Sequence, residues 1–157
     1  MKRLLSFFVF GIIVYTGNTI AQDSSLIAYW HFDDSTAFDS SVHQNHGTLH
    51  GVTLAENRYG ESNKAFYFDG IDDFISIDSY NNMSPTTDVS VAAWIKTADT
   101  LSDRAVIYDR LETHDGFGLV LNASGYPRLS INGGAESCTA IEEVDDQQWH
   151  FVVGTYS

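Results

Sequence analysis

The chain has 157 residues, enough for one packed domain and not for two. Its 21 acidic and 8 basic residues give a formal net charge of −13, which excludes a surface built to hold nucleic acid or anionic lipid. Cys138 is the single cysteine, so no disulfide can form within the chain.

The N-terminal residues predict an export signal. Two basic residues precede the apolar run Leu4–Tyr15, and Ala21 ends a stretch whose small residues suit cleavage. The run is shorter than the roughly 20 residues that a membrane-spanning helix needs. We therefore expect residues 1–21 to be a signal peptide and the mature chain to start at Gln22, with no membrane span, as a secreted or cell-surface protein.

Downstream of the signal, the sequence predicts an all-β fold. No long segment has the spacing of an amphipathic helix, and short β-branched and aromatic runs alternate with Gly, Asn, Asp and Ser. Within the run Val89–Ile95, Trp94 is expected to fill the core or the space between sheets. The expected strands are Ile27–Phe32, the region of Thr48–Val52, Ala65–Phe68, Phe74–Ile77, Val89–Ile95, Ala105–Tyr108, Phe117–Leu121, Arg128–Ile131 and His150–Thr155.

Acidic residues gather in two of the connections. The first, Asp33–Gly47, is fifteen residues long, and a loop of that length usually has a function or is held by other groups. The second is the turn in the stretch AFYFDGIDDFISI, which contains Asp72 and Asp73. Carboxylate and amide oxygens are calcium ligands, but Asp and Gly are also ordinary turn formers, so both interpretations stay open.

Histidines and a pair of carboxylates suggest two further kinds of site. His43, His46 and His50 have spacings of three and four that suit zinc on a helix, but nearby glycines argue against a helix and favour solvated loop histidines. Glu143 and Asp145 could form a glycosidase pair only within a strand, and their polar surroundings predict a turn instead. No catalytic residues are therefore expected.

Aromatic side chains bear on sugar binding. Sugars bind to exposed aromatic faces helped by a few polar groups. Most aromatic residues here fall in strand patterns, where packing is the default. Tyr126, in the turn ASGYPR, is the best candidate for a ligand contact.

Several motifs in order carry a family resemblance. The stretches IAYWHFDDS, DSSVHQNHGTLHG, RYGESNKAFYFDGIDDFISI, VSVAAWIKT and QQWHFVVGTYS resemble the laminin G-like and pentraxin-like domains of the concanavalin A-type lectin/glucanase superfamily. The resemblance spans Ser25 to Ser157. It implies an antiparallel two-sheet jelly-roll sandwich over residues 22–157, with a ligand-facing concave side. Members of the family continue with further strands after the last motif, so the sandwich is expected to be incomplete at the C-terminus.

The resemblance also implies a function and a metal. It brings the two acidic loops to one end of the sandwich, where Ca²⁺ would be bound by Asp33, Asp39, Asn45, Asp72 and Asp73. The expected function is a secreted, non-catalytic recognition or adhesion module for a glycan or an extracellular protein. The alternative is an accessory part of a secreted glycosidase whose catalytic part lies elsewhere.

Overall fold

The computed structural model describes residues 25–77, 88–98, 103–108 and 116–157, so the expected signal peptide lies outside the described residues. The described part is built of antiparallel strands and one 3₁₀ turn, η1. In chain order the elements are β1 (Gly47–His50), β2 (Thr53–Ala55), β3 (Ala65–Tyr67), β4 (Phe74–Ile77), β5 (Val89–Ile95), β6 (Arg104–Tyr108), β7 (Phe117–Leu121), β8 (Pro127–Ile131), η1 (Asn132–Gly134), β9 (Glu136–Thr139) and β10 (His150–Tyr156).

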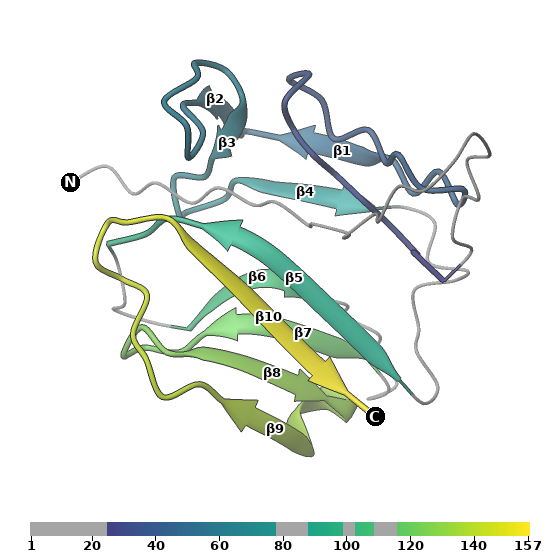
Figure 1. Cartoon of the computed structure of the whole chain (residues 1–157), viewed down its shortest axis with the longest axis vertical. Coiled ribbons are helices and arrows are strands. Elements are labelled where there is room, and N and C mark those ends of the chain that lie inside the picture. Colours follow the sequence, from purple (N-terminus) through teal and green to yellow (C-terminus); the bar gives the residue numbers. More distant parts are fainter. Residues whose placement is uncertain (1–24, 78–87, 99–102, 109–115) are drawn as a thin grey trace, which may run out of the picture.

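The strands form layers, as a jelly-roll sandwich requires. Strands β6, β7, β8 and β9 pair in sequence order as a meander, while β5 pairs with the distant β10. Figure 1 shows the β5–β10 pair lying across the meander, with the pairs β1–β4 and β2–β3 above it. The expected all-β antiparallel sandwich is thereby confirmed.

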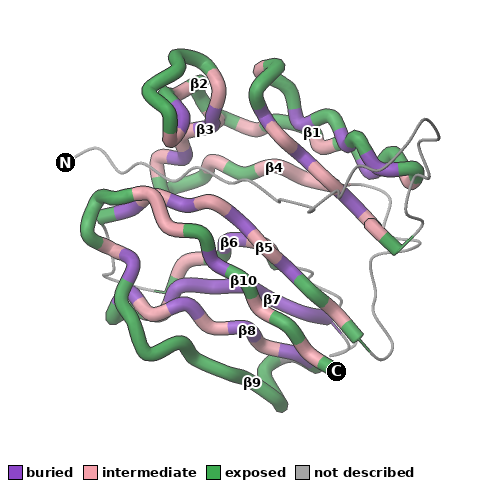
Figure 2. Tube along the Cα trace, viewed as in Figure 1, coloured by how far each residue is buried: buried purple, intermediate pink, exposed green. Residues whose placement is uncertain are grey.

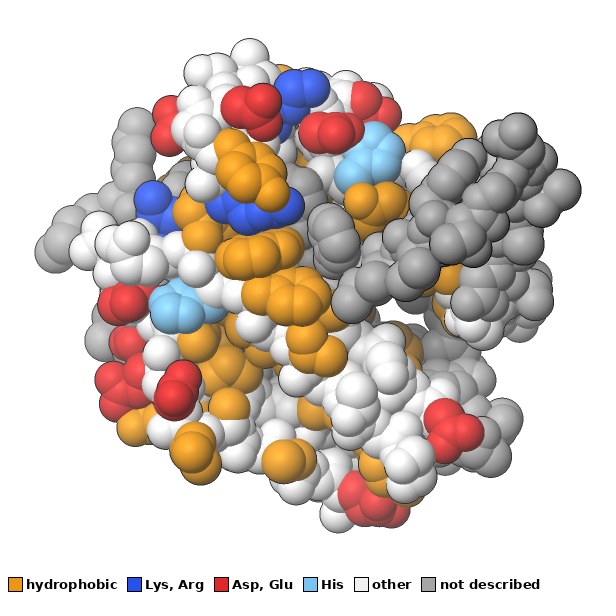
Figure 3. Space-filling model, in the orientation of Figure 1, with side chains coloured by type: hydrophobic (Ala, Val, Ile, Leu, Met, Phe, Trp, Pro, Cys, Tyr) orange, Lys and Arg blue, Asp and Glu red, His pale blue; other side chains and the backbone are white. Residues whose placement is uncertain are grey.

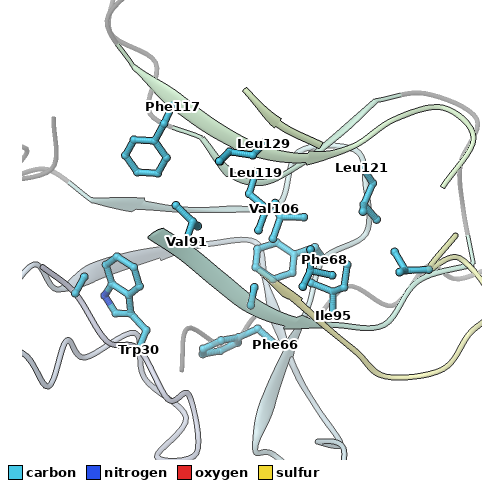
Figure 4. Close-up of a cluster of buried hydrophobic side chains, with 14 of the residues drawn as sticks. Trp30, Phe66, Phe68, Val91, Ile95, Val106, Phe117, Leu119, Leu121 and Leu129 are labelled. Carbon is cyan, nitrogen blue, oxygen red and sulfur yellow. The ribbon is translucent and has the colours of Figure 1, made fainter. Parts of the chain in front are cut away.

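The core lies between β5–β10 and the meander. Along β5 the residues Val91, Ala93 and Ile95 are buried, and the residues between them are not (Figure 2). Side chains of β5 point toward Leu119 and Leu129 of the facing sheet (Figure 4). Such two-residue periodicity is what a strand with one covered face requires.

Gly154 of β10 allows a close approach between the two layers. A Cβ atom added there would lie 2.9 Å from the Cβ of Leu129 in β8. That distance is shorter than an ordinary carbon–carbon contact, so a larger residue would push the layers apart. Glycine at this position therefore fixes the local thickness of the core.

The expected strand Ile27–Phe32 is wrong. Ala28, Trp30 and Phe32 are buried in alternation, but Trp30 makes only an isolated bridge to Asp39. The segment ends with Phe32 at φ 59°, a left-handed conformation that no strand can contain and that is rare for a bulky residue. Alternating burial here reflects packing of an irregular segment, not a ladder.

Two smaller differences follow from local chemistry. Gly51, at φ 73°, divides the expected strand near Thr48–Val52 into β1 and β2. Strand β9 was not expected, because all four of its residues are exposed and its sequence has no apolar alternation. Cys138 lies in this strand and is exposed, so it is a free surface thiol.

Candidate functional site

Two aromatic residues lie side by side on the outer face of the β5–β10 pair. Trp94 is directly opposite Phe151 in the strand register, and their ring centroids are 5.3 Å apart. Their strand neighbours Ile95 and Val152 point into the core, so the two rings point outward. Phe151 is 42% exposed, which makes this face available to a ligand.

The connection between β2 and β3 adds a cation and a third ring. The guanidinium carbon of Arg58 lies 4.3 Å from the ring centroid of Tyr59 and 4.8 Å from that of Trp94. Arg58 Nη2 also donates a 2.7 Å hydrogen bond to the Tyr59 hydroxyl. We call Tyr59, Arg58, Trp94 and Phe151 the aromatic strip. Figure 3 shows hydrophobic and basic side chains adjoining on this face.

Asn57 holds the connection in place. Its side chain is buried, and Oδ1 accepts the main-chain N–H groups of Tyr59 at 2.9 Å and Glu61 at 3.1 Å. The Asn57 Nδ2 group donates to the Glu61 carboxylate at 2.8 Å. Tyr59 is 70% exposed on a turn that is thus fixed by hydrogen bonds. The strip is therefore organised before any ligand arrives.

Trp94 was expected to fill the core or the space between sheets, and it lies instead on the outer face of β5. The alternation of β5 contains the signal that would have placed it outside, since Val91, Ala93 and Ile95 share the other face. Phe151 follows from the same rule applied to β10. Arg58 and Tyr59 could not be found this way, because they lie in a turn whose position relative to β5 depends on the fold.

Asp39 is the centre of the long loop. Its side chain is buried, and each carboxylate oxygen accepts two hydrogen bonds. Oδ1 accepts the N–H groups of Tyr29 and Ser41 at 2.8 Å, and Oδ2 accepts the Asn45 N–H and the Ser41 hydroxyl at 2.7 Å. Because four donors already occupy the carboxylate, Asp39 is suited to holding the loop.

Asn45 has a similar structural role. Its side-chain amide donates to the main-chain carbonyl of Ile27 at 2.9 Å. The main-chain carbonyl of Asn45 accepts the indole N–H of Trp30, also at 2.9 Å. Both contacts tie the loop to the irregular segment before it. The expectation that such a long loop is held by other groups is met by Asp39 and Asn45 together.

Asp72 and Asp73 belong to the turn that joins β3 to β4. This turn is not a hairpin, since β3 pairs with β2 and β4 pairs with β1. Asp69 Oδ1 accepts the N–H of Ile71 at 2.8 Å, and Asp73 Oδ2 accepts the N–H of Asp69 at 2.9 Å. The carboxylates of Asp69, Asp72 and Asp73 approach within 4.8 Å of one another.

Asp33 lies in a different group. Its carboxylate is close to His31 and Asp34, and its carbonyl accepts a hydrogen bond from Lys64. Within the described residues, neither group of close ligand atoms combines the two acidic loops. The structure thus places Asp72 with Asp73 and Asp39 with Asn45, and leaves Asp33 apart from both pairs.

The three histidines with spacings of three and four lie in the long loop and in β1. His46 Nδ1 accepts the main-chain N–H of Asp39 at 3.1 Å, and its ring stacks on Phe38. His50 stacks on Phe74 and shares a 3.0 Å hydrogen bond with Ser76. Among the residues described, the close groups of possible metal ligands do not include His43, His46 or His50, and His50 lies in β1 rather than in a loop.

Tyr126 is partly exposed at the turn between β7 and β8. Its hydroxyl donates a 2.7 Å hydrogen bond to Glu143, and this bond raises the pKa of the Tyr126 phenol. Glu143 and Asp145 lie in the irregular segment before β10, as expected, and not in a strand. Tyr126 remains a predicted ligand contact, now with its polar end engaged by a carboxylate.

Tyr29 relates the Asp33 group to the aromatic strip. Burial and the negative charge of Asp33 raise the pKa of the Tyr29 phenol, while Arg58 works in the opposite direction. The Tyr29 ring also lies beside His31, with ring centroids 5.8 Å apart.

Comparison with known proteins places the chain in a family. Neither the curated proteins nor the solved structures contain a match to it. In the part that the structure describes, no helix has the length and apolar character of a membrane span. A laminin G-type family model, described as the concanavalin A-like lectin/glucanases superfamily, matches residues 68–157, which include β4 to β10, and the chain therefore belongs to this superfamily.

Proposed function

We propose that the protein is a secreted, non-catalytic recognition module that binds a glycan across the aromatic strip. Domains of this superfamily often bind carbohydrates or extracellular ligands, and laminin G-like domains are generally non-catalytic and typically extracellular. The observation that supports a glycan is the strip itself, where three rings and a guanidinium meet on an exposed sheet face.

Sugar chemistry suits this combination of groups. The C–H faces of a pyranose pack on aromatic rings, and its hydroxyl groups accept hydrogen bonds from a guanidinium. The successive contacts Tyr59–Arg58, Arg58–Trp94 and Trp94–Phe151 bring both kinds of group together. A chain of sugars could contact several of these groups at once.

Replacing Trp94 with alanine is expected to weaken glycan binding by about tenfold to a hundredfold, because it removes the central ring that contacts both Arg58 and Phe151. The measurement is affinity gel electrophoresis against soluble β-glucan, xylan, galactan and pectin. Tyr108→Ala is the matched control, since Tyr108 is 55% exposed but lies on β6, outside the strip. Equal retardation of both variants and the parent would show that the strip does not bind glycan.

Calcium dependence is part of the same proposal, with ligands revised by the geometry. Asp39 and Asn45 are engaged by the loop, so the carboxylates best placed for calcium are Asp69, Asp72 and Asp73. Oxygen ligands of this kind suit Ca²⁺. Neutralising three close carboxylates would also relieve their mutual repulsion.

Millimolar calcium is therefore expected to stabilise the fold by about 2.7 kcal/mol at about a hundredfold excess over the dissociation constant. The check is the thermal midpoint in EDTA and in calcium. Asp72→Asn should abolish the shift, and Glu142→Gln, which neutralises another exposed acid, should keep it. A midpoint that ignores calcium in the parent protein would leave Asp69, Asp72 and Asp73 as turn residues.

A further inference from the structure

A histidine and two aspartates lie together at the end of the irregular N-terminal segment. A ring nitrogen of His31 and carboxylate oxygens of Asp33 and Asp34 are all within 4.8 Å of one another. Of these residues only Asp33 was among the predicted calcium ligands. His31 supplies a nitrogen, so the group is chemically different from the carboxylates at Asp69, Asp72 and Asp73.

The backbone around this group is fixed by contacts on both sides. Phe32 is 4% exposed and packs edge-to-face on Phe66, with ring centroids 5.2 Å apart. Ser35 Oγ donates to the Asn63 carbonyl at 3.1 Å, and Lys64 donates to the Asp33 carbonyl. The three side chains are thus presented by a segment that is anchored to the core and to the β2–β3 connection.

Asp34 is oriented in its turn. Its Oδ1 atom accepts the N–H and the hydroxyl of Thr36, at 3.0 and 2.7 Å. Burial works to raise the pKa of Asp34, but these hydrogen bonds and the nearby His31 hold it below its ordinary value. Because both of these bonds go to Oδ1, Oδ2 is left to serve as a ligand.

His31 and Asp33 already contact each other within this group. Nδ1 of His31 is shielded from solvent and lies against Oδ1 of Asp33 as an ion-pair contact. The two atoms in contact are thus an imidazole nitrogen and a carboxylate oxygen, both of which bind transition metals. A cation held by Nδ1 and the carboxylates would replace this direct contact and neutralise the two acids together.

We propose that His31, Asp33 and Asp34 bind a divalent transition-metal cation, for which Zn²⁺ is the probe. One imidazole nitrogen with two carboxylates suits zinc, whereas calcium prefers oxygen ligands throughout. Three protein ligands leave a coordination position open to water or to a hydroxyl group of a bound molecule. The ring of Tyr29 lies beside the group, with its centroid 5.8 Å from that of His31.

The test is isothermal titration of Zn²⁺ into the full chain at neutral pH, with separate titrations of Ca²⁺. One zinc per chain is expected, bound more tightly than calcium. His31→Ala and Asp33→Asn should each weaken zinc binding by at least about tenfold. His150→Ala is the control, because His150 also contacts an aspartate, Asp146 at 2.8 Å, but lies outside the three-residue group.

Circular dichroism of each variant shows whether it is folded, and Asp33→Asn decides the question if His31→Ala does not fold. Zinc binding that is unchanged in Asp33→Asn would overturn the proposal. Equal affinity for zinc and calcium would also overturn it, because the imidazole would then contribute nothing. Loss of binding in His150→Ala would place the zinc elsewhere.

Discussion

Asp39→Ala is expected to lower the free energy of unfolding by about 3 to 5 kcal/mol, which is among the largest effects that one substitution can have. The change removes the acceptor for three main-chain N–H groups, those of Tyr29, Ser41 and Asn45. Each buried donor left unpaired costs about 1 to 3 kcal/mol, and water that enters the site and binds the freed N–H groups reduces this cost. Equilibrium unfolding in urea measures the loss.

Two variants separate this effect from the loss of a negative charge. Asp39→Asn keeps one acceptor oxygen and should lose less stability than Asp39→Ala. Asp72→Ala removes a carboxylate that is exposed in the β3–β4 turn, and in EDTA, where no calcium is bound, it should change stability by no more than about 0.5 kcal/mol. If Asp39→Ala were as stable as Asp72→Ala, the loop would be held by other contacts.

Phe66→Ala is expected to cost about 3 to 5 kcal/mol, the range for deleting a fully buried ring. Phe66 is 1% exposed, contacts Phe32 and lies beneath β5 in the core (Figure 4). Both phenylalanines precede residue 68, where the family match begins. The measurement, again by urea unfolding, therefore asks whether the N-terminal part shares one core with β5 to β10.

Phe74→Ala is the matched control for Phe66→Ala. Phe74 is 52% exposed on β4, where it stacks on His50. Losing that contact should cost at most about 1 kcal/mol. A single unfolding transition with a small loss in Phe66→Ala would contradict the packing described here, and two separate transitions would show two folding units.

The fold could be predicted where periodicity and burial agree. Strands β5, β7 and β10 alternate or carry apolar side chains along their whole length, and the sequence placed them within a residue or two. The segment Ile27–Phe32 has the same pattern, but among the described residues it pairs with no strand and makes only the bridge from Trp30 to Asp39. Its Tyr29 N–H bonds to a side chain, which no periodicity can reveal. The polar strand β9 forms by pairing with β8, and its residues have no apolar alternation that would predict a strand.

The candidate site was less predictable because the type of a residue does not show which hydrogen-bond or ion-pair partners its side chain has in the folded protein. The aspartates Asp33, Asp39 and Asp72 look alike in the sequence. One contacts a histidine, one binds four donors in the core and one lies in an exposed turn. The aromatic strip needs residues from a turn and from two strands distant in sequence. Only Trp94 and Phe151 could have been placed outside the core by alternation.

The pairing of β5 with β10 bears on the order in which the molecule is built. The meander of β6 to β9 joins neighbours along the chain, and such local contacts form quickly. Strand β5 has to wait, since its partner follows the entire meander in the sequence. On the ribosome, Trp94 emerges long before Phe151, and the edge of β5 that pairs with β10 lacks its partner until β10 is made. The surface proposed to bind glycan is therefore complete only after β10 has joined β5.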